Sequence, residues 1–166
     1  MDELSPLAAT LPAHPGRDEV ILDELWAFVG SKAQQVWIWL ALSRHHLQIL
    51  AFHVGPRDGE SARQLWEHVP LPWKRDLVFT DGFTAYPPVF QERPLQHCRC
   101  FKSGPNALCE EFGETAALEG VNNALRAGVS YLGRKSLAFA RSLHWLRYRL
   151  TWFIHCWNQR QDKKHH

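Results

Sequence analysis

Three apolar runs follow one another in the first third of the chain, separated only by short polar segments. They are residues 20–30 (VILDELWAFVG), 35–43 (QVWIWLALS) and 46–55 (HLQILAFHVG). Their β-branched and aromatic residues predict three strands, of which the second is central in the sheet and the third is its antiparallel neighbour. A chain that opens with three consecutive strands must organise its core around a sheet.

The rest of the chain alternates between helical and strand patterns. We predict, in order, a helix at 60–69, a short buried strand at 76–80, a turn or short helix at 84–91, an edge strand at 95–100, a loop at 101–112, and helix from 116 to 161 with a break at Gly133. Strands followed by strands interleaved with helices indicate an α/β fold, with a mixed five-stranded sheet flanked by helices.

The N-terminal segment and the overall composition define a single-domain protein. Residues 1–18 contain early acids and prolines and predict a flexible leader, so that residues 19–166 form one domain. The leader has no basic region of the kind that opens a signal peptide, and no apolar run reaches the roughly 18 residues of a membrane span. We therefore expect a cytoplasmic protein without a membrane partner.

The charge of the chain is divided unevenly along its length. Residues 119–166 contain nine Lys and Arg against two acids, whereas residues 1–118 contain ten basic and fifteen acidic residues. A basic C-terminal third beside an acidic body favours a polyanionic partner, and a solvated helical face is an equally weighted reading.

A carboxylate stands at the end of the apolar run 77–79, in the sequence DLVFTDGFTAY. Asp81-Gly82 between apolar segments is a typical hairpin turn. The following FTAYPP is a poor strand, because its prolines remove ladder donors. The alternative places Asp81 at the carboxyl edge of a buried strand, where open α/β sheets collect their ligands.

Two further acids could join Asp81 in such a site. Asp23 lies within the first predicted strand, and Glu119 lies near the start of the long helical segment. At 100° per residue Glu119 falls off the apolar stripe of that helix, which consists of Leu118, Val121, Leu125, Val129 and Leu132. The alternative for each of these acids is a surface charge, and for Glu119 taken alone that alternative is favoured. Glu24 points to the strand face opposite Asp23, so we do not assign it to the site.

The ordered set LDELWAFVGSK…VWIWLALS, VGPRDGESARQLWEHVP, VFTDGFTAY and GETAALEGVNNALRAGVSYLGRKSLAFARS resembles the catalytic part of insertion-sequence-one family transposases. These are DDE enzymes with a ribonuclease-H-like core, and the resemblance covers about residues 20–160. It implies the catalytic domain of a DNA transposase, which cleaves transposon ends and joins the 3′-OH to target DNA. By position, Asp23, Asp81 and Glu119 match the three catalytic carboxylates, which would hold two Mg²⁺ or Mn²⁺ ions.

The resemblance also implies the partners. The expected partner is double-stranded DNA, both transposon ends and target, and we expect a homo-oligomer on the DNA and association with the nucleoid. An upstream-frame zinc-finger and helix-turn-helix segment would read the ends. The alternative is a truncated, non-catalytic product that binds DNA or dimerises with the full transposase and regulates it. The candidate DNA contacts are Lys32, Asn122, Asn123, Arg126, Arg134, Lys135 and Arg141.

Overall fold

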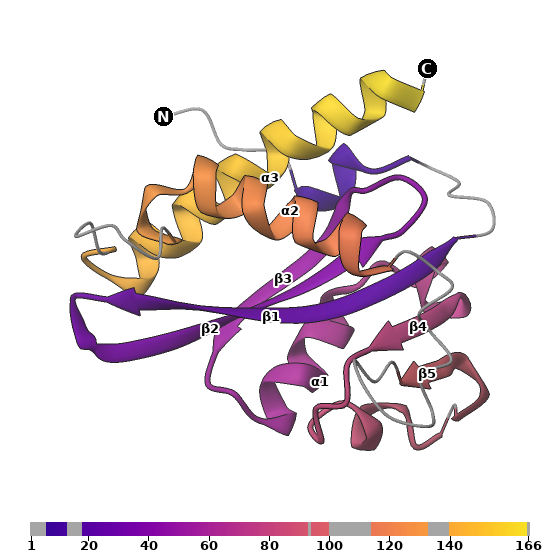
Figure 1. The fold of residues 1–166 in the computed structure, drawn as a ribbon. Helices are drawn as coiled ribbons and strands as arrows, with labels where there is room; N and C mark the ends of the chain where they lie inside the picture. Colours follow the sequence, from indigo (N-terminus) through magenta and orange to yellow (C-terminus); the bar gives the residue numbers. More distant parts are fainter. Residues whose placement is uncertain (1–5, 13–17, 93, 100–113, 133–139, 166) are drawn as a thin grey trace.

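A five-stranded sheet forms the centre of the molecule, in the strand order β3-β2-β1-β4-β5 (Figure 1). The computed structural model describes residues 6–12, 18–92, 94–99, 114–132 and 140–165, and the predicted loop at 101–112 lies outside these ranges. The strands are β1 (Glu19–Val29), β2 (Ser31–Ser43), β3 (Ile49–Gly55), β4 (Leu77–Thr80) and β5 (His97–Arg99).

The strands run in both directions. β1, β2 and β3 pair antiparallel in sequence order, whereas β4 pairs parallel with β1 and β5 pairs parallel with β4. The prediction of a mixed five-stranded sheet flanked by helices is confirmed, and the arrangement is consistent with a ribonuclease-H-like fold. β2 is an interior strand as predicted, although β1 is the middle one; the antiparallel pairing of β3 with β2 and the edge position of β5 are confirmed as well.

The hairpin reading of Asp81-Gly82 is wrong. The chain does not return beside β4 after this dipeptide but forms a 3₁₀ turn, Pro87–Phe90, and later adds β5 in parallel. Pro87 and Pro88 have no N–H to give to a ladder, which explains why no second strand follows immediately. Asp81 therefore follows directly on the carboxyl end of β4.

Helices cover both faces of the sheet (Figure 1). α1 (Gly59–His68) lies on one face, and α2 (Glu114–Gly128) and α3 (Leu143–His165) lie on the other. The Asp58 carboxylate accepts a hydrogen bond of 2.8 Å from the Ser61 N–H and caps α1. The described chain also has 3₁₀ turns at Leu7–Thr10, Leu71–Arg75, Pro94–Gln96 and Ser130–Leu132.

The two faces of the sheet bury separate apolar cores, because side chains alternate along each strand. In β1, Ile21 and Leu25 join the core under α2 and α3, whereas Val20 and Leu22 join the core beside α1. The predicted helical stripe contributes to the first core: Val121, Leu125, Val129 and Leu132 are buried, and Leu118 packs against them.

The buried amide of Asn158 fixes α3 to the edge strand β3. Its Oδ1 accepts a 2.8 Å hydrogen bond from the Ile49 N–H, and its Nδ2 donates to the Ile49 carbonyl at 2.9 Å. The same Nδ2 lies 2.9 Å from the Thr10 hydroxyl. Thr10 belongs to the segment predicted as a flexible leader, so the part of that leader at residues 6–12 is packed onto the domain.

Within the described residues, no helix is both long enough and apolar enough to cross a membrane.

Candidate functional site

Asp23 lies in β1, and Asp81 directly follows the adjacent parallel strand β4. The register of β1 and β4 pairs Ile21 with Phe79 and Leu22 with Thr80. Asp23 directly follows Leu22, and Asp81 directly follows Thr80. Neighbouring strands in a sheet lie about 4.8 Å apart. Both side chains are half-buried. The sheet thus brings together two carboxylates that are far apart in the sequence.

A tight turn orients the Asp81 side chain. Its Oδ1 accepts a hydrogen bond of 2.9 Å from the Phe83 N–H, two residues further on. Asp and Asn favour such turns because their side chains can bond the backbone two residues later. Asp81 therefore has one oxygen engaged with its own loop, and its direction is coupled to the position of Phe83.

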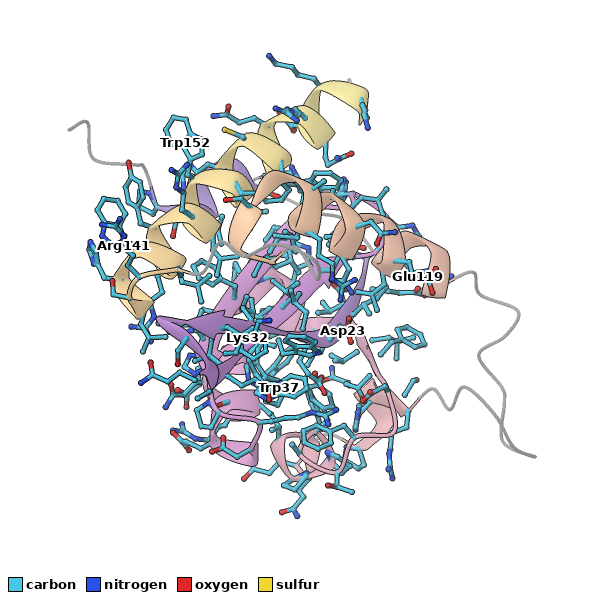
Figure 2. The ribbon with its side chains drawn as sticks, turned by 60° about the vertical axis from the view of Figure 1, so that its left-hand side comes forward. Asp23, Lys32, Trp37, Glu119, Arg141 and Trp152 are labelled. Atoms are coloured by element: carbon cyan, nitrogen blue, oxygen red, sulfur yellow. The ribbon has the colours of Figure 1, made fainter. Side chains whose placement is uncertain are left out.

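α2 lies against the Asp23 side of the sheet. Asn122 Nδ2 donates to Asp23 Oδ2 at 2.8 Å, and the Oδ1 of the same amide is buried without a hydrogen-bond partner. Glu119 stands three residues earlier, and residues spaced by three are neighbours on a helix surface. It is exposed, and Figure 2 shows it near the N-terminal end of α2, on the same side of the molecule as Asp23.

Glu24 points to the opposite face of the sheet, as its place in the strand predicts. Its side chain is only 2% exposed, and it accepts hydrogen bonds from Arg57 and from the Tyr86 hydroxyl. Burial raises the pKa of Glu24, the bonds from Arg57 and Tyr86 lower it, and the charges of Asp81 and Asp23 raise it; the net change is upward. The pKa of Tyr86 is also raised, chiefly by burial.

The donor set suits a hard cation. Mg²⁺ prefers oxygen ligands and is commonly held by one or two carboxylates, with waters and substrate phosphates completing its shell. Asp23 and Asp81 provide such a pair, and the unpartnered Asn122 Oδ1 adds a buried acceptor beside it. Among the described residues, no three His, Cys, Asp or Glu side chains are grouped closely enough to hold a metal, so Glu119 is not gathered with the two aspartates.

The predicted DNA contacts lie at several places. Asn123 is exposed and Arg126 half-buried on α2, where Asn122 contacts Asp23. Lys32 is exposed near the start of β2, and Arg141 is exposed just before α3 (Figure 2). Arg141 and Glu119 lie at opposite ends of the helical layer (Figure 2). Arg134 and Lys135 lie outside the described residues.

Two parts of this arrangement were missed by sequence reasoning. The bond from Asn122 to Asp23 joins residues 99 positions apart, and the bond from Arg57 to Glu24 joins residues 33 positions apart. Arg57 falls in PRDGE, whose only sequence signal is that of a turn. No local pattern could have revealed either contact, although the acid pair Asp23-Glu24 in a buried strand requires a counter-charge.

Comparison with known proteins completes the description. The family model described as IS1 transposase matches residues 19–157. The insertion element iso-IS1n protein InsB of Shigella dysenteriae is 30% identical over 122 residues, which cover 74% of this chain and 82% of that protein. The insertion element IS1 4 protein InsB of Escherichia coli K12 is 28% identical over 144 residues, which cover 85% of this chain and 78% of that protein.

Proposed function

The chain belongs to the IS1 transposase family, and from that premise we propose that Asp23, Asp81 and Glu119 are the carboxylates with which it cleaves and joins DNA strands. The observation that carries the proposal is the register of β1 and β4, which sets Asp23 and Asp81 in one row at the carboxyl end of β4. Ligand sites of open α/β sheets lie at such strand ends.

The three carboxylates would act on phosphodiester bonds. A pair of Mg²⁺ or Mn²⁺ ions, when bound, activates the attacking oxygen and stabilises the leaving oxygen of an in-line displacement. Asp23 and Asp81 are the residues that would hold them, with Glu119 as the third carboxylate. Asn122 donates a 2.8 Å hydrogen bond to one oxygen of Asp23 and so orients this carboxylate.

The reaction would run in two displacements. Water attacks the phosphodiester at the transposon end, and the leaving 3′ oxygen takes up a proton to become a 3′-OH. That 3′-OH then attacks a phosphodiester of the target DNA, so that one bond forms as another breaks. Neither displacement consumes an oxidant or a reductant, so the reaction requires only the carboxylates, the cations and residues that bind DNA.

Double-stranded DNA would be held by the basic C-terminal third. Arg141, Arg149 and Arg160 are exposed on or just before α3, and Lys32 is exposed on the sheet. Contacts of Arg and Lys to phosphate position DNA without reading its sequence. Recognition of the transposon ends would then fall to an upstream-frame zinc-finger or helix-turn-helix segment, with the chain acting as a homo-oligomer on the DNA.

Strand cleavage by the wild-type transposase and by Glu119→Gln tests the proposal. The substrate is a duplex with the element's own terminal sequence, in Mn²⁺, with Glu67→Gln as the matched control. Both glutamates are exposed on helices, so neither change should alter the fold. We expect Glu119→Gln to lose at least about 100-fold in rate, and Glu67→Gln to cleave normally. Cleavage by Glu119→Gln at the wild-type rate would remove Glu119 from the site.

A further inference from the structure

A cluster of aromatic rings holds Arg57 on the sheet face opposite Asn122. The Arg57 guanidinium lies 4.5 Å from the centroid of the Trp37 ring and 4.1 Å from that of the Phe83 ring. Its Nε and Nη2 both donate to Glu24 Oε1, at 3.0 and 2.6 Å. Figure 2 shows Trp37 on the other side of the sheet from Glu119. We call Glu24, Trp37, Arg57 and Phe83 the Arg57 cluster.

The Arg57 cluster contacts both segments that carry the aspartates, β1 and the turn after β4. Glu24 directly follows Asp23 in β1, and Phe83 is the residue whose N–H holds the Asp81 carboxylate at 2.9 Å. A planar guanidinium can stack on rings while its N–H groups bond a carboxylate, which an ammonium cannot do as well. Arg57 therefore ties the turn after β4 to the segment of β1 that contains Asp23.

The turn after β4 needs such a tie. β4 has only four residues, and its ladder with β1 ends at the pair Leu22 and Thr80, so Asp81 lies beyond the last paired position. Asp23 and Asp81 carry like charges at neighbouring positions and repel each other when no cation is bound. The Tyr86 hydroxyl, which donates to Glu24 Oε2 at 2.8 Å, attaches the later part of this segment to β1, and the contact of Arg57 with the Phe83 ring holds the 81–83 turn itself.

We propose that Arg57 is a positioning residue that sets the separation of Asp23 and Asp81. It acts through the Phe83 ring and the Phe83 N–H rather than by touching substrate or cation. The inference rests on the proposed function, in which Asp23 and Asp81 hold the cations. It adds that the metal affinity of the site depends on a residue located between β3 and α1, on the other face of the sheet.

Binding of Mn²⁺ alone, followed through the melting temperature, tests the proposal. Arg57→Ala should raise the Mn²⁺ concentration that gives half of the maximal melting shift by about tenfold or more, the usual cost of losing a residue that orients a metal ligand. Arg57→Lys keeps the charge but loses the planar fork, so we expect a partial effect. The matched control is Arg63→Ala, since Arg63 is an exposed arginine that pairs with Glu60 and Glu67 on α1.

A second pair of variants keeps the test valid if Arg57→Ala folds poorly. Phe83→Leu removes the ring over Arg57 but keeps the backbone N–H, and Phe83→Tyr keeps both. We expect Phe83→Leu to need more Mn²⁺ than Phe83→Tyr, and the kcat of strand cleavage to fall in the same order with an unchanged KM for DNA. Equal Mn²⁺ midpoints for wild type, Arg57→Ala and Phe83→Leu would overturn the positioning role and leave the carboxylate assignment standing. A wild type whose melting does not respond to Mn²⁺ would overturn both.

Discussion

Asn122 shows at the scale of one residue how the helical layer takes part in the site. Its amide nitrogen donates to Asp23, and its amide oxygen is buried without a partner. A buried acceptor left unpaired costs about 1–3 kcal/mol. A cation-bound water or a DNA group would satisfy that oxygen, so we expect the cost to be recovered when the site is loaded.

Replacement of Asn122 should therefore affect chemistry more than folding. Asn122→Ala removes the bond that orients Asp23, and we expect strand cleavage to fall by about 10- to 100-fold. Gln91→Ala is the matched control, because Gln91 is an exposed amide outside the candidate carboxylates and the candidate DNA contacts. Cleavage rates of the two variants, measured at equal DNA occupancy, check this. Equal rates for both would show that Asn122 has no special relation to Asp23.

Single residues were predicted from the sequence to different degrees. Strand ends and the family resemblance identified Asp23 and Asp81 as candidates, because a carboxylate after an apolar run is visible in one short segment. Arg57 and its pairing with Glu24 were not predictable, since the contact depends on how the turn before α1 lies over the sheet. Glu24 lies on the face opposite Asp23, as alternation along a strand predicts.

At the scale of elements, α2 is the helix that contributes Glu119 and Asn122 to the candidate site. Its apolar stripe was predicted correctly, because a period of 3.6 residues is enough to define a buried face. The end of α2 was not predicted correctly. The sequence predicts helix from 116 to a break at Gly133, whereas α2 ends at Gly128 and α3 begins at Leu143. At this end of α2, Gly128 allows the Phe153 ring of α3 to approach closely, since a Cβ on Gly128 would come within 2.2 Å of that ring.

The two glycines of α2 should respond to alanine in opposite directions. Gly120 has open space where a Cβ would go, so Gly120→Ala should stabilise the fold by about 0.5–1 kcal/mol through the better helix propensity of alanine. Gly128→Ala forces Phe153 aside and should destabilise the fold by about 1–3 kcal/mol. Urea unfolding of both variants measures this. A Gly128→Ala protein as stable as the wild type would show that α3 does not pack closely on the end of α2.

At the scale of the whole molecule, the order of elements was predictable and their limits were less so. The β-β-β-α-β order and the mixed sheet follow from apolar runs and from breakers such as Pro87-Pro88. β2 nevertheless begins at Ser31, four residues before the predicted run, and in this exposed part it pairs with β1 at Ser31 and Val29, across a shift in register. A hydrophobic pattern predicts which residues are buried. The exposed end of a strand has no such pattern, so its limit cannot be predicted in this way.

The central claim is that Asp81 belongs to a carboxylate pair that holds a cation. Melting curves of the wild type and of Asp81→Asn, each with and without Mn²⁺, test it most directly. Asn retains an oxygen that can accept from the Phe83 N–H, so the turn is kept while one charge is removed.

We expect Mn²⁺ at a hundred times its dissociation constant to stabilise the wild type by about 2.7 kcal/mol, a melting shift of roughly 5–10 °C. Asp81→Asn should melt at the same or a higher temperature without metal, because repulsion with Asp23 is relieved, and should show a smaller shift with Mn²⁺. A variant that is less stable without metal but keeps the full Mn²⁺ response would contradict the account and make Asp81 a structural turn residue.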